Sequence, residues 1–288
     1  MTNSEWTLDG SNGEPIFGVC HEPNGEALGV ALVCHGFKGY MDYGMFPCIA
    51  QEFAQAGFVA HRFNFSHSGM TRNIETFERP DLFEHDTWNK QVHDLQTVMR
   101  AVGQGELAGA GLPMIVFGHS RGGVTTLLTV GRGVDDSSIA LPAGLIVAAA
   151  PSACCSMNEK TQAEFLAQGF QDSPSARTGQ ALRVGKIWLQ EQLDDLAGHN
   201  LRSQVANIQC PVLIAHGTDD PSVPVSCAAE LKDAIGAMAQ TQLIEGANHV
   251  FNTPNPMPSD EEPSEQLAAL LNGMIDFSQS VCAGATAS

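Results

Sequence analysis

The sequence lacks a hydrophobic run long enough to cross a membrane, for which ~18 consecutive apolar residues are needed. The run at residues 143–150 is among its longest. The first ten residues, MTNSEWTLDG, contain neither a basic residue nor an apolar stretch, so they do not resemble a secretion signal. We therefore expect a soluble, cytoplasmic protein with no membrane partner.

Basic residues are scarce in this chain. Its 288 residues include 14 lysines and arginines against 32 aspartates and glutamates, which gives a formal net charge of −18 at pH 7. A surface of that sign repels phosphate backbones, so nucleic acid is excluded as an expected partner. The charge favours solubility and carries little information about catalysis.

Motifs that bind metals and cofactors are also missing. The sequence contains no CxxC, no HExxH, no GxGxxG after the first predicted strand and no phosphate-binding P-loop. Its eight cysteines occur without a secretion signal, and we interpret them as reduced thiols rather than as a disulfide framework. We expect neither a metal nor a cofactor.

The sequence does contain an alternation of predicted strands and helices. Four apolar runs are continuous, as in strands that are buried on both faces of a parallel sheet. They cover residues 29–34, 114–118, 144–149 and 211–216, with further strands at 16–21, 58–64 and 241–244. Helical patterns cover residues 46–56, 84–102, 120–130 and 222–238, and a last helix follows Ser264. This order predicts an α/β fold, with helices on both faces of a mostly parallel central sheet.

Residues 152–208 interrupt this alternation. They contain two helical patterns, at 159–170 and 182–196, without a clear strand between them. Because the segment directly follows a predicted strand, we interpret it as an insertion over the strand ends rather than as a separate domain. We predict one domain over residues 1–288, with an inserted lid at about 152–208.

Residues 117–126, FGHSRGGVTT, place a serine at the junction of a strand and a helix. Within them, GHSRG fits the pattern G-x-S-x-G around Ser120, in which the two glycines let the strand and the helix pass closely. The serine hydroxyl then projects from the edge of the sheet, on a strained backbone, above the N-terminus of a helix. This setting favours a nucleophile over a serine that only caps a helix.

A nucleophilic serine needs a base, and that base needs an acid to hold its tautomer. Both residue types follow Ser120, each just after a predicted strand. The segment HGTDDPSVP provides Asp219 and Asp220, and the segment LIEGANHVF provides His249. Because functional groups gather at the carboxyl ends of parallel strands, we expect these side chains at the same edge of the sheet as Ser120.

These segments resemble the α/β-hydrolase family, in family order and over nearly the whole chain. GHSRGG, HGTDDPSVP and GANHVF are similar to the three segments that carry the family's serine, acid and histidine. In the pattern HG-x-x-D-x-x-V-P the acid is the fifth residue. The resemblance therefore implies a triad of Ser120, Asp220 and His249, and it leaves Asp219 as a solvated turn or cap residue.

A fourth segment, CHGFKGYMDYGMFP, resembles the family's oxyanion loop. The resemblance implies that the backbone N–H groups of Phe37 and Arg121 stabilise an oxyanion, and that His35 organises the loop. The segment FNFSHSGMT offers another serine, Ser68, which lacks a glycine two residues earlier and a helix directly after it. We interpret that segment as a shaped loop.

The motifs HGFKGYMDYGMFP, FNFSHSG and RTGQ resemble bacterial esterases of the feruloyl and cinnamoyl branch, in which an insertion covers the acyl pocket. The resemblance implies a carboxylic ester hydrolase that acts on a small-molecule ester. Trp188 in the insertion either lines the acyl pocket or packs the insertion onto the sheet. The only two tyrosines, Tyr40 and Tyr43, lie in the oxyanion loop and are candidate substrate contacts.

Other functions are compatible with the same motifs. A serine peptidase, a thioesterase or an acyltransferase would use the same triad with a different pocket. A non-catalytic binding protein on this fold would typically have lost a member of the triad, and this sequence retains all of them.

Overall fold

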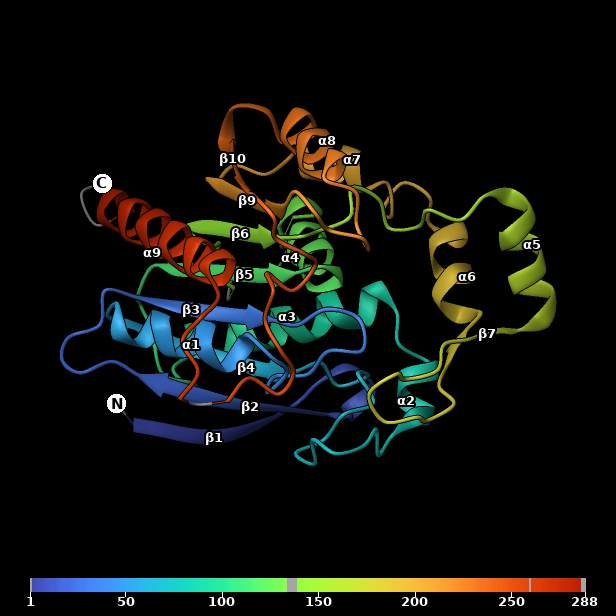
Figure 1. Ribbon diagram of the computed structural model, residues 1–288, viewed down its shortest axis with the longest axis horizontal. Coiled ribbons are helices and arrows are strands. Elements are labelled where there is room, and N and C mark those ends of the chain that lie inside the picture. Colours follow the sequence, from blue (N-terminus) through green and yellow to red (C-terminus); the bar gives the residue numbers. More distant parts are fainter. Residues whose placement is uncertain (1, 134–138, 259, 286–288) are drawn as a thin grey trace.

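The computed structural model describes residues 2–133, 139–258 and 260–285. An eight-stranded sheet with the order β1-β2-β4-β3-β5-β6-β9-β10 forms its centre (Figure 1). Its strands are β1 (Thr2–Asp9), β2 (Pro15–Glu22), β3 (Gly29–Cys34), β4 (Phe58–Asn64), β5 (Met114–His119), β6 (Gly144–Ala148), β9 (Val212–Gly217) and β10 (Ala239–Ile244). Only the pairings of β2 with β1 and with β4 are antiparallel. The predicted α/β fold class is confirmed.

Strand β3 shows why the apolar runs form the middle of the sheet. All of its residues are buried. Val30 and Leu32 belong to the hydrophobic core on one face, whereas Ala31 and Val33 belong to the core on the other face. Because successive side chains of a strand point to opposite faces, a continuous apolar run satisfies both cores at once.

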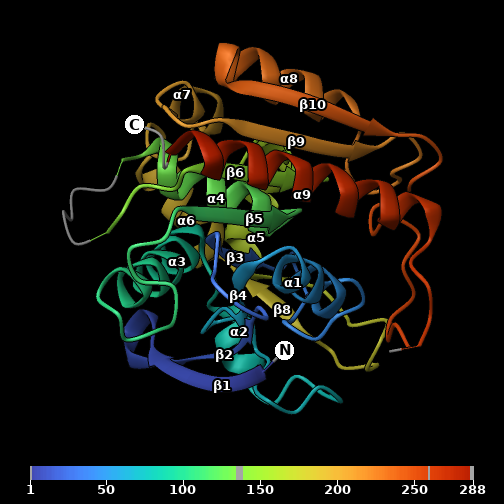
Figure 2. The same ribbon diagram turned by 90° about the vertical axis from the view of Figure 1, so that its left-hand side faces the viewer.

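Helices cover both faces of the sheet, as Figure 2 shows from the side. The main helices are α1 (Phe46–Gln55), α3 (Trp88–Gly103), α4 (Arg121–Gly131), α8 (Ser226–Ile235) and α9 (Glu265–Ala285). Residues of α1 and α9 join the core on one face, and residues of α3, α4 and α8 join the core on the other face. The central strands are therefore buried on both sides, and the loops at their carboxyl ends are left open for function.

The helical pattern predicted at 84–102 is broken in the structure. A short helix, α2 (Pro80–Glu84), ends before α3 begins. Thr87 has an extended backbone, and its hydroxyl accepts a hydrogen bond of 3.4 Å from the backbone N–H of Lys90, so it caps α3. The break leaves Asp86 in the turn between the two helices, where it faces the site described below.

The segment that follows β6 stands beyond the carboxyl ends of the parallel strands (Figure 1). It contains α5 (Glu159–Gln168), β7 (Phe170–Asp172), β8 (Arg183–Gly185), α6 (Ile187–Asp194) and α7 (Leu201–Val205). The interpretation of this segment as two helical pieces was wrong in one respect, because β7 and β8 pair as an antiparallel ribbon and β8 lies inside the second predicted helix. Helix α7 contacts α4 and α8, so this end of the segment packs against the main sheet layer.

The cysteines are free thiols, and several of them are core residues. Burial raises the pKa of Cys34 and of Cys154 to about 12, so both thiols stay protonated at neutral pH.

Within the described ranges, no helix combines the length and the apolarity that crossing a membrane requires.

Candidate active site

Ser120 lies on a sharp turn between β5 and α4. Its backbone has φ 54° and ψ −119°, a strained conformation for a residue with a side chain. The flanking glycines are required by close backbone approach, because a Cβ on Gly118 would overlap the carbonyl oxygen of Gly122, and a Cβ on Gly122 would overlap that of His35. The turn leaves Ser120 half-buried, with its hydroxyl toward the loops at the sheet edge.

The structure brings Ser120, His249 and Asp220 together in one hydrogen-bonded line. His249 Nε2 lies 3.0 Å from Ser120 Oγ, and His249 Nδ1 lies 2.8 Å from Asp220 Oδ2. The three residues come from the loops after β5, β10 and β9, so the carboxyl ends of three parallel strands supply them. In this geometry Ser120 donates its proton toward Nε2, while Nδ1–H donates to the carboxylate.

The Asp220 side chain is fully buried and richly hydrogen-bonded. Its Oδ1 accepts from the backbone N–H groups of Ser222 at 2.8 Å and Val223 at 3.0 Å. Burial raises the pKa of this carboxyl, but hydrogen bonds from His216, from His249 and from those backbone groups outweigh burial and hold the pKa well below its usual range. The carboxylate therefore stays ionised and holds the His249 proton on Nδ1.

Asp219 lies apart from this line. Its side chain is exposed, and its nearest polar partner is the hydroxyl of Thr218 at 3.3 Å. Its backbone N–H donates to the carbonyl oxygen of Ala247. The structure thus separates the two neighbouring aspartates, with Asp220 facing His249 and Asp219 facing solvent.

His119 supports His249 from behind, which the sequence did not reveal. His119 Nε2 donates to the backbone oxygen of His249 at 2.7 Å, and the two ring centroids are 4.9 Å apart. Burial lowers the pKa of His119 to about 3, so this ring is neutral at working pH. A neutral neighbour does not repel an imidazolium on His249. The only sequence signal was its position inside G-x-S-x-G, which does not show where the side chain packs.

The loop after β3 passes directly beside Ser120. A Cβ on Gly36 would lie 3.1 Å from Ser120 Cβ, so the following residue, Phe37, begins next to Ser120. His35 Nδ1 donates to the oxygen of Gly36 at 2.9 Å, and its Nε2 accepts from the backbone N–H of Phe65 at 3.3 Å. Burial lowers the pKa of His35 to about 4, which keeps this bridging ring neutral. His35 holds the loop in place, as expected.

Arg121 occupies the first position of α4, where a backbone N–H has no partner inside the helix. This donor and the backbone N–H of Phe37 are the two predicted oxyanion donors, and both residues lie beside Ser120.

The Arg121 guanidinium lies 3.1 Å from Asp86 Oδ2 and 4.9 Å from the centroid of the Trp88 ring. Burial raises the pKa of Asp86 to about 6 despite the attraction of Arg121. Asp86 and Trp88 had no sequence signal, because they are brought here by the break between α2 and α3.

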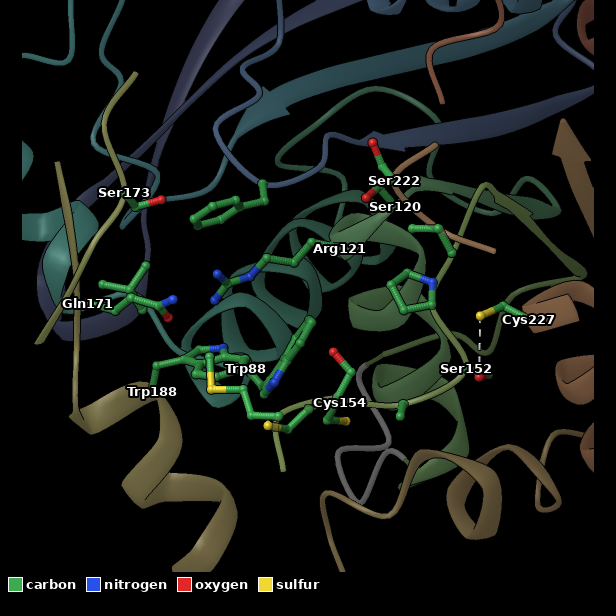
Figure 3. A pocket seen from close by; sticks show the side chains of 18 of the residues that line it. Trp88, Ser120, Arg121, Ser152, Cys154, Gln171, Ser173, Trp188, Ser222 and Cys227 are labelled. Carbon is green, nitrogen blue, oxygen red and sulfur yellow. Dashed lines mark hydrogen bonds between the residues drawn. The ribbon is translucent and has the colours of Figure 1, made fainter. Parts of the chain in front are cut away.

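A cavity of about 470 Å³ opens from Ser120 toward the inserted segment (Figure 3). We call it the aromatic pocket, and its lining includes Ser120, Arg121, Phe37, Trp88 and Trp188. Figure 3 shows the Arg121 side chain extending toward Gln171, with Trp88 and Trp188 next to each other on one side of it. Trp188 also stacks on Phe165 with a centroid distance of 6.5 Å.

A second cavity, of about 210 Å³, shares Ser120 and Phe37 with the aromatic pocket. We call it the histidine-side pocket, and its lining includes Ser120, His249, Tyr43, Lys38 and Arg177. Tyr40 is buried, with a relative exposure of 4%, and it contacts the Tyr43 ring and the Arg177 guanidinium. It is not among the described residues that line this pocket. A substrate contact by Tyr40 stays a prediction.

Of the serines in the FNFSHSGMT segment, Ser66 belongs to a scaffold network, and the Ser68 hydroxyl accepts a hydrogen bond of 3.3 Å from the backbone N–H of Met70. Ser66 Oγ donates to Asp94 Oδ2 at 2.7 Å, and Asp94 also accepts from the backbone N–H of Ser11. Asp94 is fully buried, so this network connects the N-terminal strands to α3.

Among the residues that the structure describes, no group of three or more histidines, cysteines or carboxylates is arranged to bind a metal ion.

Comparison with known proteins identifies the family and the fold. A sequence profile of the alpha/beta hydrolase family matches residues 31–270. No curated protein matches the sequence significantly. Est1E from Butyrivibrio proteoclasticus, solved with ferulic acid bound, is 17% identical with a TM-score of 0.70, over 96% of this chain and 99% of that chain. The esterase domain of a Rhodothermus marinus protein is 18% identical with a TM-score of 0.64, over 97% and 99%. Alpha/beta hydrolase domain-containing protein 10 from mouse is 18% identical with a TM-score of 0.69, over 96% and 99%.

Proposed function

The chain belongs to the alpha/beta hydrolase family, and from this premise we propose that it hydrolyses carboxylic esters through an acyl-enzyme intermediate. The observation that carries the proposal is the hydrogen-bonded line from Ser120 Oγ through His249 to the buried, ionised Asp220. Such a line turns a hydroxyl, a weak nucleophile at neutral pH, into a reactive one.

The proposed reaction has two halves. Ser120 Oγ attacks the ester carbonyl while His249 Nε2 takes its proton, and the leaving alcohol then receives that proton as its bond to the acyl carbon breaks. In the second half, water gives a proton to His249 and attacks the acyl-enzyme, which releases the acid and restores Ser120. Asp220 remains ionised throughout and stabilises the imidazolium.

Each attack places negative charge on the former carbonyl oxygen. The backbone N–H groups of Phe37 and Arg121 are the proposed donors to this oxyanion, because both belong to residues that flank Ser120. Fixed donors of this kind are each worth about 3 kcal/mol of transition-state stabilisation. Neither requires a side chain, so substitutions at these two positions leave the donors in place.

The aromatic pocket is the proposed acyl site. Its rings, Phe37, Trp88 and Trp188, offer flat apolar surfaces around Ser120. Ferulic acid, bound in the solved Est1E structure, is an aromatic acid, which supports aromatic acyl groups as substrates here. In this proposal the inserted segment at about 152–208 is a lid that selects the acyl group without taking part in the chemistry.

A panel of activated substrates with matched acyl groups tests the proposed function. We expect kcat/KM for p-nitrophenyl esters to be higher than kcat/KM for peptide anilides by orders of magnitude. We also expect it to be clearly higher than kcat/KM for acyl-thioesters. Faster cleavage of thioesters or anilides would replace the esterase proposal by a thioesterase or a peptidase on the same residues. Transfer of the acyl group to an added alcohol in preference to water would identify an acyltransferase.

Removal of the Trp188 ring tests the lid. We expect Trp188→Ala to lower kcat/KM for cinnamoyl or long acyl esters about ten- to a hundredfold more than for acetate esters, because only large acyl groups reach that ring. Leu196→Ala is the matched control, since Leu196 is 68% exposed on the same segment. Steady-state kinetics across acyl sizes give the answer. An equal loss for every acyl size would mean that Trp188 only supports the fold.

A further inference from the structure

The histidine-side pocket lies where the leaving group of an ester must be. His249 Nε2 gives its proton to the leaving oxygen, so that oxygen has to lie next to this ring. His249 and Ser120 both line the histidine-side pocket. Of the two, only Ser120 is among the described residues that line the aromatic pocket. The acyl group and the leaving group are thereby assigned to separate cavities.

The charge of the histidine-side pocket is opposite to that of the whole chain. The protein carries 32 acidic residues against 14 basic residues, yet Lys38 and Arg177 both line this small cavity. None of the described residues that line it is an aspartate or a glutamate. A concave site with cations and no counter-charge attracts anions locally, even on an acidic protein.

Both cations are held in position by neutral groups. Lys38 Nζ donates to the backbone oxygen of Pro174 at 2.8 Å, which leaves two of its three donors free. Arg177 donates to the backbone oxygen of Ile74, and its guanidinium lies 4.7 Å from the centroid of the Tyr40 ring. Within the described chain, neither Lys38 nor Arg177 forms an ion pair. Burial lowers the pKa of Lys38, consistent with an ammonium that is partly removed from water.

The aromatic pocket makes the contrast clear. Its cation, Arg121, lies 3.1 Å from the Asp86 carboxylate, and the carboxylate among its described lining residues, Asp172, lies 3.4 Å from Arg183 Nε, so each charge has a partner of opposite sign. The acyl side therefore presents aromatic rings with a compensated charge, whereas the leaving-group side presents two uncompensated charges. The two cavities differ in the chemistry that each one recognises.

Building on the ester hydrolysis proposed above, we propose that the histidine-side pocket binds the leaving group and selects an alcohol that carries an anionic group. Lys38 and Arg177 are the specificity-determining residues. The anion is a carboxylate or a phosphate, since both accept charge-assisted hydrogen bonds from ammonium and guanidinium groups. Its placement by these cations would bring the scissile oxygen to His249 Nε2.

Three butyrate esters test this assignment because they share an acyl group and differ in the para substituent of the leaving phenol, which is anionic in two of them and neutral in the third. The phenols are 4-hydroxybenzoate, 4-hydroxyphenyl phosphate and the neutral, similarly shaped 4-hydroxybenzamide. We expect kcat/KM, corrected for rates of alkaline hydrolysis, to favour at least one anionic ester over the benzamide ester about tenfold or more. The preferred anionic ester distinguishes a carboxylate from a phosphate.

Charge-removing variants connect the preference to the pocket. Lys38→Gln and Arg177→Gln should each reduce the ratio of anionic to neutral kcat/KM about tenfold. Lys160→Gln changes the net charge equally, at a site on α5 whose side chain is 86% exposed, and should leave the ratio unchanged. Raising the salt concentration with the unaltered protein should lower the ratio as well, which keeps the test valid if a variant misfolds.

The outcomes separate this assignment from the esterase proposal. Hydrolysis of the benzamide ester with no preference for either anionic ester would overturn the leaving-group assignment and leave the esterase proposal standing. The leaving-group assignment would also be overturned if Lys160→Gln lowered the ratio as much as Lys38→Gln. Hydrolysis of p-nitrophenyl butyrate but of none of the three esters would overturn the leaving-group assignment alone, whereas hydrolysis of none of the four would overturn both proposals.

Discussion

Replacing Ser120 with alanine is expected to lower kcat for an activated ester about 10⁴-fold or more. Without the hydroxyl there is no attacking atom 3.0 Å from His249 Nε2, and only the oxyanion donors and the pockets remain. The loss should appear in kcat and in kcat/KM alike, because the missing interaction belongs to the transition state. Steady-state kinetics on a p-nitrophenyl ester measure it.

The fold should tolerate this substitution. Ser120 is half-buried, and its backbone N–H still donates to the oxygen of Ala148 in the variant. Thermal unfolding of the variant should therefore match that of the unaltered protein within a few degrees. Ser68→Ala is the matched control in the competing serine segment. Retention of more than about a tenth of the activity by Ser120→Ala would exclude Ser120 as the nucleophile.

The second large effect is expected for Asp220→Asn, which should lower kcat by up to about 10⁴-fold. An amide carries no charge and cannot hold the His249 proton on Nδ1, so Nε2 no longer accepts from Ser120 reliably. The low pKa of Asp220 means that the carboxylate of the unaltered protein is ionised throughout the working pH range. The amide of the variant does not titrate, so a rise in pH should not restore a carboxylate beside His249.

Asp219→Asn provides the comparison, because it makes the same chemical change one residue earlier on an exposed side chain. It should change kcat by no more than a few fold. The two variants are measured side by side on one ester. A large loss for Asp219→Asn with a small loss for Asp220→Asn would reverse the assignment of the acid.

The central strands were predictable because their sequence signal is strong. For β3 and β4 the predicted and observed bounds coincide at residues 29–34 and 58–64. Strand β1 was not predicted. It is an edge strand with mostly exposed residues, and its main anchor is Trp6, whose ring occupies the space that a Cβ on Gly18 would need. That contact comes from the pairing of β1 with β2 and leaves no periodic pattern in the sequence.

The candidate site also contains residues that the sequence points to and residues that only the structure brings together. Ser120 and His249 lie in short motifs whose residue types and strand context already indicate chemistry, and the resemblance to the family pattern singles out Asp220 from Asp219, so the sequence was enough to propose these three residues. The supporting residues His119 and Asp86, and the cations of the histidine-side pocket, gain their roles from contacts between distant segments. Lys38 and Arg177, for example, are separated by well over a hundred positions and line one cavity only because the segment around Pro174 folds back onto the loop after β3.

Active-site labelling tests the central claim most directly. The protein is treated with a fluorophosphonate, digested, and examined by mass spectrometry for the modified residue. We predict one phosphonylated peptide, modified at Ser120, that is absent from Ser120→Ala and strongly reduced in Asp220→Asn. Labelling of Ser120→Ala to the same extent, or modification of Ser66 or Ser68 in place of Ser120, would contradict the account.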